Sequence, residues 1–347
     1  MKPMAIALPS RALSVRLSGA IASLLLVATG CTTPTANVSA TGSNDAGGNA
    51  ANTQEKTLRI GFTAADGGNL PIGPIGWAEK QGYLDDELKE AGISDVEFYG
   101  FDSGPGVNEA LAAGELDVSM NGDTPALVGK TNGLRTQLIN INQAGINVYL
   151  IPKKGGNIRS VADLNGKKVG VRIGAIPHRY LVGLLQQTGL TGKVKVVNLT
   201  NSEGEAALAR GDIDAYAATG ALAFRLKSQG YTVIDEAADH GDLVGSNVTS
   251  ASEAFLTDHP EFVDNWYEVI ARATQEIKAQ PQAYYQFVSE INEQPLDVSE
   301  FTSPISLYPT EPLPADSIDR LRETQEFLVS EGVVKSKFSF DEWIYRK

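Results

Sequence analysis

The chain has 347 residues, of which 42% are hydrophobic and 35 are glycines, and its formal net charge is −13. This composition is typical of an ordinary globular α/β protein, and the length allows two domains. The acidic balance and the lack of a basic run argue against nucleic acid as a partner. The single cysteine, Cys31, excludes an intramolecular disulfide.

The N-terminus has the pattern of an export signal. Lys2, Arg11 and Arg16 form a basic region, a mostly apolar run covers residues 17–27, and small residues precede Cys31. The apolar run is too short to be a stable transmembrane anchor. The small residues before Cys31 resemble the lipobox of bacterial lipoproteins, which implies a cleaved signal peptide and a lipid on the cysteine. The alternative is an ordinary signal peptide with an incidental cysteine.

The stretch that follows predicts a flexible tether. Small polar side chains dominate it, and Val38 is its one sizeable apolar residue, so it cannot bury enough surface to fold. We therefore divide the N-terminal part into a lipoprotein signal peptide, residues 1–30, and a lipidated Cys31 with its tether, residues 31–56. Such an anchor places the globular part just outside a cell membrane.

Strands alternate with helices in the rest of the chain. β-branched and aromatic runs indicate strands, and periodic apolar positions with glycine stops indicate helices. The expected strands are 57–62, 96–99, 116–120, 135–143, 147–152, 168–171, 194–198, 231–234 and 243–249. The expected helices are 75–80, 108–113, 177–188, 205–210, 221–228, 259–279 and 316–330. The alternation predicts mostly parallel, doubly wound sheets.

One supersecondary unit occurs twice. The sequence ALAAGELD begins at Ala110 and ALARGDID begins at Ala207, and each reads as a helix, a glycine stop and the start of a buried strand. Two copies predict two similar α/β lobes. The alternative is that such a pattern is common in any α/β protein.

Doubly wound sheets bind ligands at the loops that follow the carboxyl ends of their strands. The candidate loops are 63–69, 122–124, 174–178 and 219–220, two in each half of the chain. We expect the two lobes to face each other with the ligand between them. Free backbone N–H groups at the helix starts can hold an anion or a carbonyl oxygen there.

Catalytic and metal chemistry has little support in the sequence. The three histidines, His178, His240 and His259, do not have the spacing of a metal site. Asp66 and Asp123 could be an acid–base pair, but no nucleophile or orienting partner accompanies them. Solvated loop carboxylates or helix caps are the simpler interpretation, and we expect no enzyme, no metal and no cofactor.

Several stretches resemble a known family. The lipobox, the loop Gly122-Asp123-Thr124-Pro125 and the stretch Leu150–Leu181 are similar to substrate-binding lipoproteins of ABC importers for nitrate, sulfonates and taurine. The related binding proteins for pyrimidine precursors share this pattern. The resemblance implies an α/β type II periplasmic-binding-protein fold, in which two doubly wound lobes are joined by a two-strand hinge. Closure of the lobes around a ligand then produces the form that a permease recognises.

The resemblance also implies the domain boundaries. Lobe I would comprise residues 58–147 and, after the chain returns, residues 247–347 with the C-terminal helices. Lobe II would comprise residues 148–246. The hinge strands would lie near 147–151 and 244–249.

The implied ligand-binding residues come from both lobes. They are Thr63, Asn69, Gly122, Asp123, Thr124, Asn147, Gly174, Ala175, Ile176, His178, Thr219 and Gly220. Ala175 and Ile176 stand where the family has side chains that bind a sulfonate, and Thr219-Gly220 replaces a usual Trp-Asp-Pro. These departures make the second-lobe wall apolar and favour a larger or more hydrophobic organic anion over taurine.

The resemblance implies an extracytoplasmic, lipid-anchored, monomeric binding protein. It would capture a small organic anion, sulfonate-like in character, and deliver it to an ABC permease. One alternative is a binding protein for a pyrimidine or thiamine precursor or another neutral heterocycle. Others are a sensory surface lipoprotein and a pyrimidine-precursor synthase on the same fold. The export signal argues against the synthase, because such enzymes are cytosolic.

Overall fold

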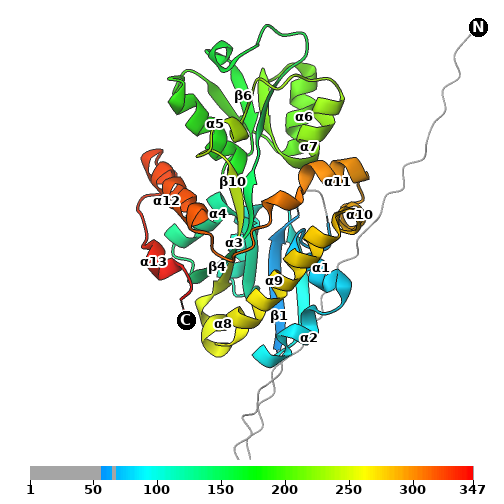
Figure 1. The fold of residues 1–347 in the computed structure, drawn as a ribbon. Coiled ribbons are helices and arrows are strands. Elements are labelled where there is room, and N and C mark those ends of the chain that lie inside the picture. The colour runs from blue at the N-terminus through cyan, green and yellow to red at the C-terminus, as the bar shows by residue number, and fades with distance from the viewer. Residues whose placement is uncertain (1–55, 65–67, 347) are drawn as a thin grey trace, which may run out of the picture. The chain divides into compact units, whose positions relative to one another are not determined.

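The structure is a computed structural model that describes residues 56–64 and 68–346, all within one compact unit, residues 52–347. The predicted signal peptide, Cys31, nearly all of the tether and Asp66 lie outside the described residues. The described chain forms two sheets, each flanked by helices (Figure 1). Among its helices, none is both long and apolar enough to cross a membrane.

The first sheet has the strand order β2-β1-β3-β10-β4. Its strands are β1 (Lys56–Thr63), β2 (Ile93–Phe101), β3 (Val118–Gly122), β4 (Thr136–Ile146) and β10 (Gly245–Ser252). β1 is parallel to β2 and β3, whereas β10 is antiparallel to both β3 and β4. We call this sheet with its helices the first lobe.

The second sheet repeats this arrangement with the order β7-β6-β8-β5-β9. Its strands are β5 (Tyr149–Pro152), β6 (Lys168–Val171), β7 (Lys195–Asn198), β8 (Ala215–Ala218) and β9 (Asp235–Glu236). β6 is parallel to β7 and β8, and β5 is antiparallel to β8 and β9. This sheet with its helices is the second lobe. The chain passes between the lobes twice, from β4 to β5 and from β9 to β10.

Helices follow most of the strands and cover both sheets. Before β10 they are α1 (Pro74–Gln81), α2 (Leu84–Leu88), α3 (Gly104–Ala112), α4 (Asp123–Thr131), α5 (Ile176–Gln187), α6 (Asn201–Arg210) and α7 (Gly220–Ser228). After β10 come α8 (Glu253–Asp258), α9 (Phe262–Ala279), α10 (Pro281–Ile291), α11 (Leu296–Thr302), α12 (Ala315–Ser330) and α13 (Phe340–Trp343). Short 3₁₀ turns are η1 (Lys89–Ala91), η2 (Val161–Leu164), η3 (Ala237–Asp239) and η4 (Ile305–Leu307).

Two expectations about these elements are wrong. The predicted strand 231–234 is irregular; the Ile234 N–H donates to the Leu150 carbonyl (3.0 Å), and the strand β9 begins at Asp235. The predicted helix 259–279 begins at Phe262 instead, because Pro260 disfavours helical backbone at His259 and separates α8 from α9.

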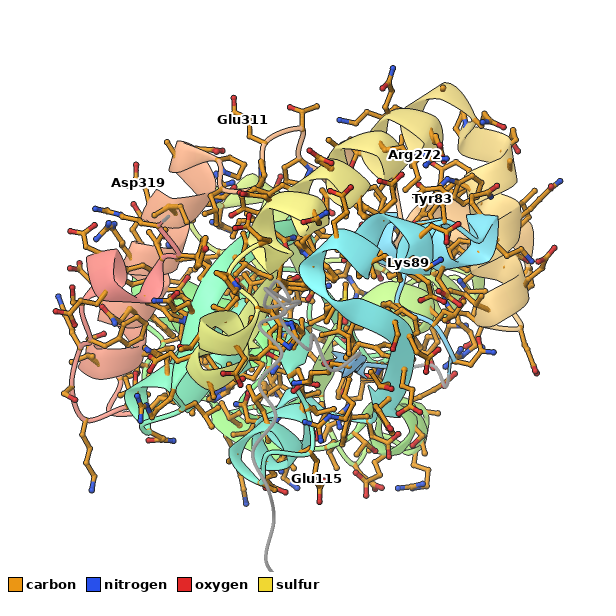
Figure 2. The ribbon with its side chains drawn as sticks, turned by 90° about the horizontal axis from the view of Figure 1, so that it is seen from below. Tyr83, Lys89, Glu115, Arg272, Glu311 and Asp319 are labelled. Carbon is orange, nitrogen blue, oxygen red and sulfur yellow. The ribbon has the colours of Figure 1, made fainter. Side chains whose placement is uncertain are left out.

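The long helix α9 buries one face against the first sheet. Its buried residues recur at helical spacing and pack in one cluster with Leu58 and Ile60 of β1. Glu276 of α9 accepts hydrogen bonds from the Trp77 indole (3.0 Å) and the Tyr83 hydroxyl (3.2 Å). The Arg272 guanidinium lies 3.6 Å from the centre of the Tyr83 ring (Figure 2). α9 is therefore joined to α1 and α2 by polar contacts at the edge of the core.

The C-terminal part also contacts the second lobe. Phe301 of α11 stacks on Tyr149 of β5 with ring centroids 5.6 Å apart, and its edge meets Phe224 of α7 at 5.4 Å. The Lys227 ammonium lies above both Tyr149 and Phe301. α11 is thus a further connection between the lobes besides the two chain crossings.

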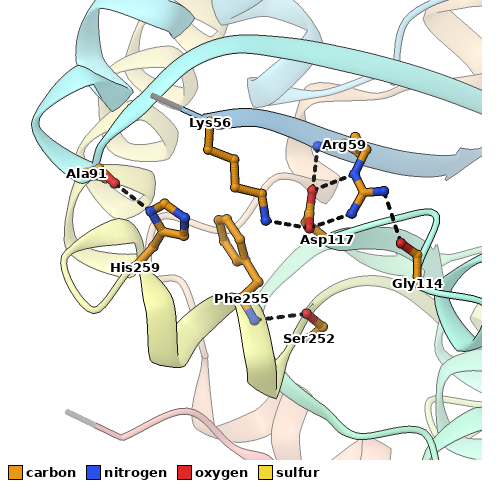
Figure 3. A network of polar contacts seen from close by, with 8 residues as sticks. All are labelled: Lys56, Arg59, Ala91, Gly114, Asp117, Ser252, Phe255 and His259. Atoms are coloured by element: carbon orange, nitrogen blue, oxygen red, sulfur yellow. Dashed lines mark hydrogen bonds and ion pairs between the residues drawn. The ribbon is translucent and has the colours of Figure 1, made fainter. Parts of the chain in front are cut away.

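An aspartate directly before the central strand anchors each lobe. Asp117 precedes β3, and its carboxylate accepts from the Arg59 backbone N–H (3.0 Å), the Arg59 guanidinium and the Lys56 ammonium (2.8 Å) (Figure 3). Asp214 precedes β8 and accepts from the Lys168 backbone N–H (3.0 Å) and the Lys153 ammonium (2.8 Å). The glycine stops before them, Gly114 and Gly211, have φ of 75° and 79°, where a side chain would be strained. The predicted repeat is confirmed in the fold.

Burial raises the pKa of Asp117, but the hydrogen bonds from Arg59 and Lys56 outweigh it, so the pKa lies below its ordinary value of 3.8. The pKa of Asp214 also lies below its ordinary value of 3.8. Burial raises this pKa, but the hydrogen bonds from the Lys153 ammonium and the Lys168 N–H lower it by more. A lowered folded-state pKa means that the carboxylate stabilises the fold above the ordinary pKa. That stabilisation is lost as the pH falls through the lowered value.

We expect Asp117→Asn to lower the melting temperature at about pH 7 more than Asp214→Asn, because charge-assisted hydrogen bonds contribute about 1.5–3 kcal/mol. The Asp117 side chain is 5% exposed and the Asp214 side chain 21%. The difference in melting temperature between wild type and Asp117→Asn should narrow as the pH falls through the lowered pKa of Asp117, because below it both proteins carry an uncharged group there. Circular dichroism melts measure this, with the exposed Asp319→Asn (Figure 2) as the control. A difference in melting temperature that stays constant with pH would show that the charge of the Asp117 carboxylate does not stabilise the fold.

Candidate ligand-binding site between the lobes

A cavity of about 270 Å³ lies between the two lobes. The first lobe lines it with residues at the ends of β1, β3 and β4 and at the start of α3. The second lobe lines it with Arg172 after β6, with the first turn of α5, and with Asn201 and Thr219. The cavity thus lies where the strands of both sheets lead into helices, which is the usual place for ligands in doubly wound sheets.

Carboxamide side chains form much of the first-lobe wall. Asn121 is 2% exposed; its Nδ2 donates to the Gly104 carbonyl (3.2 Å), and its Oδ1 accepts from the Thr63 hydroxyl (3.3 Å). Gln143 donates to the Tyr308 hydroxyl (3.2 Å) and accepts from Asn247 (2.6 Å). These bonds hold the polar atoms of the wall in place, so little reorganisation is needed when a ligand binds.

Arg172 is the one cationic side chain among the described residues that line the cavity. Its guanidinium forms no ion pair or hydrogen bond with any described residue. Gly174, with φ of 82°, turns the chain into α5. The N-cap residue Ala175 and the first-turn residues Ile176 and Pro177 of this helix also line the cavity. A free guanidinium and a helix start on the same wall can together attract an anion.

A buried ion pair joins the lobes beside the cavity. Asp123 at the start of α4 and Arg179 of α5 are 2% and 3% exposed, and Oδ2 lies 3.7 Å from Nη2. The same Oδ2 accepts from the Ser246 backbone N–H at 2.8 Å. Arg179 also donates to the carbonyls of Asp242 and Val244, on the segment that returns to the first lobe. The pair therefore connects α5, α4 and the second chain crossing.

Ile176 fits into a slot lined by glycines next to this pair. A Cβ on Gly245 would lie 2.3 Å from the Ile176 Cγ2, and a Cβ on Gly122 would lie 3.6 Å from its Cδ1. The first-lobe backbone can therefore approach the first turn of α5 only because Gly245 has no side chain. This contact fixes the position of the cavity-lining turn.

A family described as NMT1/THI5 like matches residues 69–284, which is more than half of the chain. The chain belongs to the NMT1/THI5-like family. A protein of Bacillus subtilis (strain 168) named for binding aliphatic sulfonates is 27% identical over 236 residues, which are 67% of this chain and 68% of the relative. The matches to two Escherichia coli (strain K12) relatives span only 50% and 61% of their lengths.

Solved structures show that this NMT1/THI5-like chain has the predicted fold. The crystal structure of a periplasmic aliphatic sulphonate binding protein from Escherichia coli aligns with a TM-score of 0.70 at 21% identity, covering 84% of this chain and 97% of that one. The desulfurization enzyme DszB aligns with a TM-score of 0.63 at 15% identity, covering 84% and 96%. These likenesses confirm a type II periplasmic-binding-protein fold. Because that fold also occurs in an enzyme, function has to be argued from the cavity.

Five of the predicted binding residues line the cavity of this NMT1/THI5-like protein. They are Thr63, Gly122, Ala175, Ile176 and Thr219. Gly174 and Gly220 do not line it, and their φ values of 82° and 56° show that they turn the chain into α5 and α7.

The other predicted residues have contacts elsewhere. Asp123 and Thr124 are buried, and both the N–H and the hydroxyl of Thr124 donate to Asp123 Oδ1. Asn147 donates to Glu236 (2.8 Å) and accepts from the Val148 and Ala238 N–H groups, so it orders the first crossing. Burial lowers the pKa of His178, whose Nδ1 accepts from the Gly174 N–H (3.5 Å). Asn69 is exposed. Their contact with a ligand stays a prediction.

The sequence interpretation missed the polar residues that distinguish this cavity. Arg172 lies within the stretch that carries the family resemblance, two residues before the predicted loop 174–178. Asn142 and Gln143 lie in β4, where they and Asn140 are buried amides in an otherwise largely apolar strand. Polar side chains in a buried strand need partners, and this is the signal that could have identified them.

We expect Arg179→Met to destabilise the protein by about 3–5 kcal/mol, because it leaves the Asp123 carboxylate buried without its counter-charge. The double variant Asp123→Asn with Arg179→Met should lose less than the sum of the two single variants. Urea unfolding measures these free energies. Arg210→Gln, which breaks the exposed pair with Asp212, is the control and should change little. Strict additivity of the two buried substitutions would show that the pair is not coupled.

Proposed function

We propose that this chain is an extracytoplasmic solute-binding protein of an ABC importer. It captures a small organic anion, sulfonate-like in character, between its lobes and delivers it to a permease. The observation that carries the proposal is Arg172, a cation that lines the cavity between the lobes and has no charged partner among the described residues. The names of the relatives, which refer to aliphatic sulfonates and taurine, support the same ligand class.

The electrostatics of the protein make a local cation important. The formal net charge is −13, so the surface as a whole repels anions. At physiological ionic strength, exposed charges are screened beyond about 8 Å. A guanidinium in a partly enclosed cavity is screened less and can form two parallel hydrogen bonds with the oxygens of an acidic group. Arg172 can therefore determine anion selectivity despite the acidic surface.

The apolar residues of the cavity suit the remainder of an organic ligand. Phe62, Leu70, Ile72, Met120 and Ile146 contribute from the first lobe, and Ile176 and Pro177 from the second. Burial of a hydrocarbon tail contributes about 25 cal/mol for each Å² removed from water. An anionic head with an apolar body matches both parts of the lining.

The proposal requires no chemistry on the ligand. The described residues that line the cavity include no histidine and no cysteine, and Asp102 is their one carboxylate. No group of His, Cys, Asp and Glu among the described residues is arranged to hold a metal ion. This lining supports capture and release in preference to the enzyme alternative.

A neutral heterocycle is the second candidate ligand. The amides of Asn142, Gln143 and Asn247 offer donors and acceptors such as a pyrimidine ring needs. A neutral ligand would leave Arg172 without a counter-charge, and for this reason we place it second.

The proposal includes the membrane anchor and a monomeric state. A lipid on Cys31 and the tether of residues 31–56 would hold the binding lobes near the permease. A tethered domain searches a small volume, which raises its effective concentration at the membrane.

We expect Arg172→Gln to weaken the binding of pentanesulfonate about 10–100-fold, because a hydrogen bond to a charged group contributes about 1.5–3 kcal/mol. The melting temperature of the empty protein should change little, since Arg172 forms no hydrogen bond or ion pair with a described residue. Isothermal titration calorimetry measures the affinity, and Arg210→Gln in the same lobe is the control. Loss of uracil binding, with no effect on the sulfonate, would favour the neutral-ligand candidate.

We expect the full chain to fractionate with membranes and Cys31→Ser to appear in the soluble extracytoplasmic fraction, because the variant cannot receive the lipid. Immunoblotting of cell fractions measures the distribution. Thr32→Ser, which changes the neighbouring residue but retains the thiol, is the control. The same distribution for both variants would show that Cys31 is not an anchor.

A further inference from the structure

Asn142 of β4 is 7% exposed and lines the cavity. Its Oδ1 accepts from the Thr249 hydroxyl at 2.7 Å and from Asn140 Nδ2 at 2.6 Å. Its Nδ2 donates to no described residue. Among the described residues, six side-chain polar atoms are both fully buried and without a partner, and Asn142 Nδ2 is not one of them. The nitrogen therefore retains accessible surface, and the surface that the residue lines is the cavity.

The orientation of this amide is determined by a buried tryptophan. The Trp266 indole N–H donates to Asn140 Oδ1 at 2.9 Å. An indole nitrogen can only donate, so the atom of Asn140 that faces it must be the oxygen. The Asn140 nitrogen then faces Asn142, and the Asn142 atom that it meets must also be the oxygen. We call this chain of hydrogen bonds, from Trp266 through Asn140 to Asn142, the relay. The two N–H bonds of Asn142 are consequently directed away from it.

The residues that fix the orientation of Asn142 are all buried. Trp266 and Thr249 are 0% exposed and Asn140 is 1% exposed. In this setting a flipped amide would place a donor against a donor, which is costly where water cannot compensate. The polarity of Asn142 is therefore a fixed property of the first-lobe wall.

We infer that Asn142 is a specificity-determining residue that donates to an acceptor oxygen of the ligand. The inference rests on the proposed function and refines its ligand class: the ligand presents an oxygen such as S=O or C=O to Asn142. An ammonium or amide N–H at that point is rejected, because two donors would face each other. Asn142 lies on the first lobe and Arg172 on the second, so the two recognise the ligand from opposite walls.

Two matched probes separate this role from that of Arg172. Pentanesulfonate carries charged oxygens, and pentyl methyl sulfone carries two similar oxygens without the charge. Asn142→Ala should weaken both probes by about the same factor, on the order of 10-fold, because one donor is removed. Arg172→Gln should weaken the sulfonate much more than the sulfone. Calorimetry on the purified wild type and the two variants gives the six dissociation constants.

The relay itself is tested by Trp266→Phe, which retains an aromatic ring but removes the indole N–H. We expect about a two- to fivefold loss for both probes, because the Asn140–Asn142 pair can then populate the flipped orientation. Thr274→Val, on the same helix α9 and also buried, is the matched control and should leave both affinities unchanged. Asn142→Asp should abolish sulfonate binding by adding a like charge.

The outcomes distinguish the two proposals. If Asn142→Ala and Trp266→Phe weaken the sulfone while Arg172→Gln changes neither probe, the donor role of Asn142 stands and the anion-binding function falls. If Arg172→Gln weakens the sulfonate and the Asn142 and Trp266 variants bind both probes like wild type, the anion-binding function stands and this inference is overturned. If wild type binds neither probe, both are overturned.

Discussion

The buried ion pair of Asp123 with Arg179 controls how the two lobes meet. Arg179 belongs to α5 of the second lobe, yet its guanidinium also donates to the carbonyls of Asp242 and Val244, where the chain returns to the first lobe. Burying both charges costs desolvation free energy, and either charge buried at this position without the other would be strongly destabilising. The arrangement that satisfies them brings Ile176 against Gly122 and Gly245 and thereby builds one wall of the cavity. Ligand recognition therefore depends on a contact that does not itself line the cavity.

The two lobes share their anchoring but differ in their cavity walls. Asp117 and Asp214 form the same bonds to the preceding parallel strand in each lobe, so the repeated sequence maintains a repeated framework. At the ends of the central strands the copies differ, since β3 ends with Asn121 and Gly122 whereas β8 is followed by Thr219. The first lobe supplies fixed amides, and the second supplies Arg172 and small side chains. The two lobes therefore share one framework, and the residues that differ between them are those that line the cavity.

The sequence predicts local features well and features that depend on distant partners poorly. Strand and helix periodicity and the repeat predict two doubly wound lobes, and the loops at strand ends include the lining residues Thr63, Ala175 and Thr219. The type II fold itself is implied by the family resemblance. The family resemblance implies that Asp123 is a ligand-binding residue, because the loop Gly122-Asp123-Thr124 matches the family pattern. Its burial depends on Arg179, which lies in the other lobe. For Asn142 the sequence predicts only a place in a strand, since its free donor depends on Trp266 in α9. The sequence order does not reveal either pairing.

Placing the ligand contacts on opposite lobes links affinity to conformation. A ligand that touches both Arg172 and Asn142 binds the closed form better than an open form in which one wall has moved away, and it shifts the population by that difference in affinity. An importer requires this property, because the binding protein must hold the ligand tightly until the permease separates the lobes. The α11 contact through Phe301 and the Asp123–Arg179 pair both resist that separation. The free energy of opening is therefore set by contacts outside the cavity, whereas the identity of the ligand is set by the donors inside it.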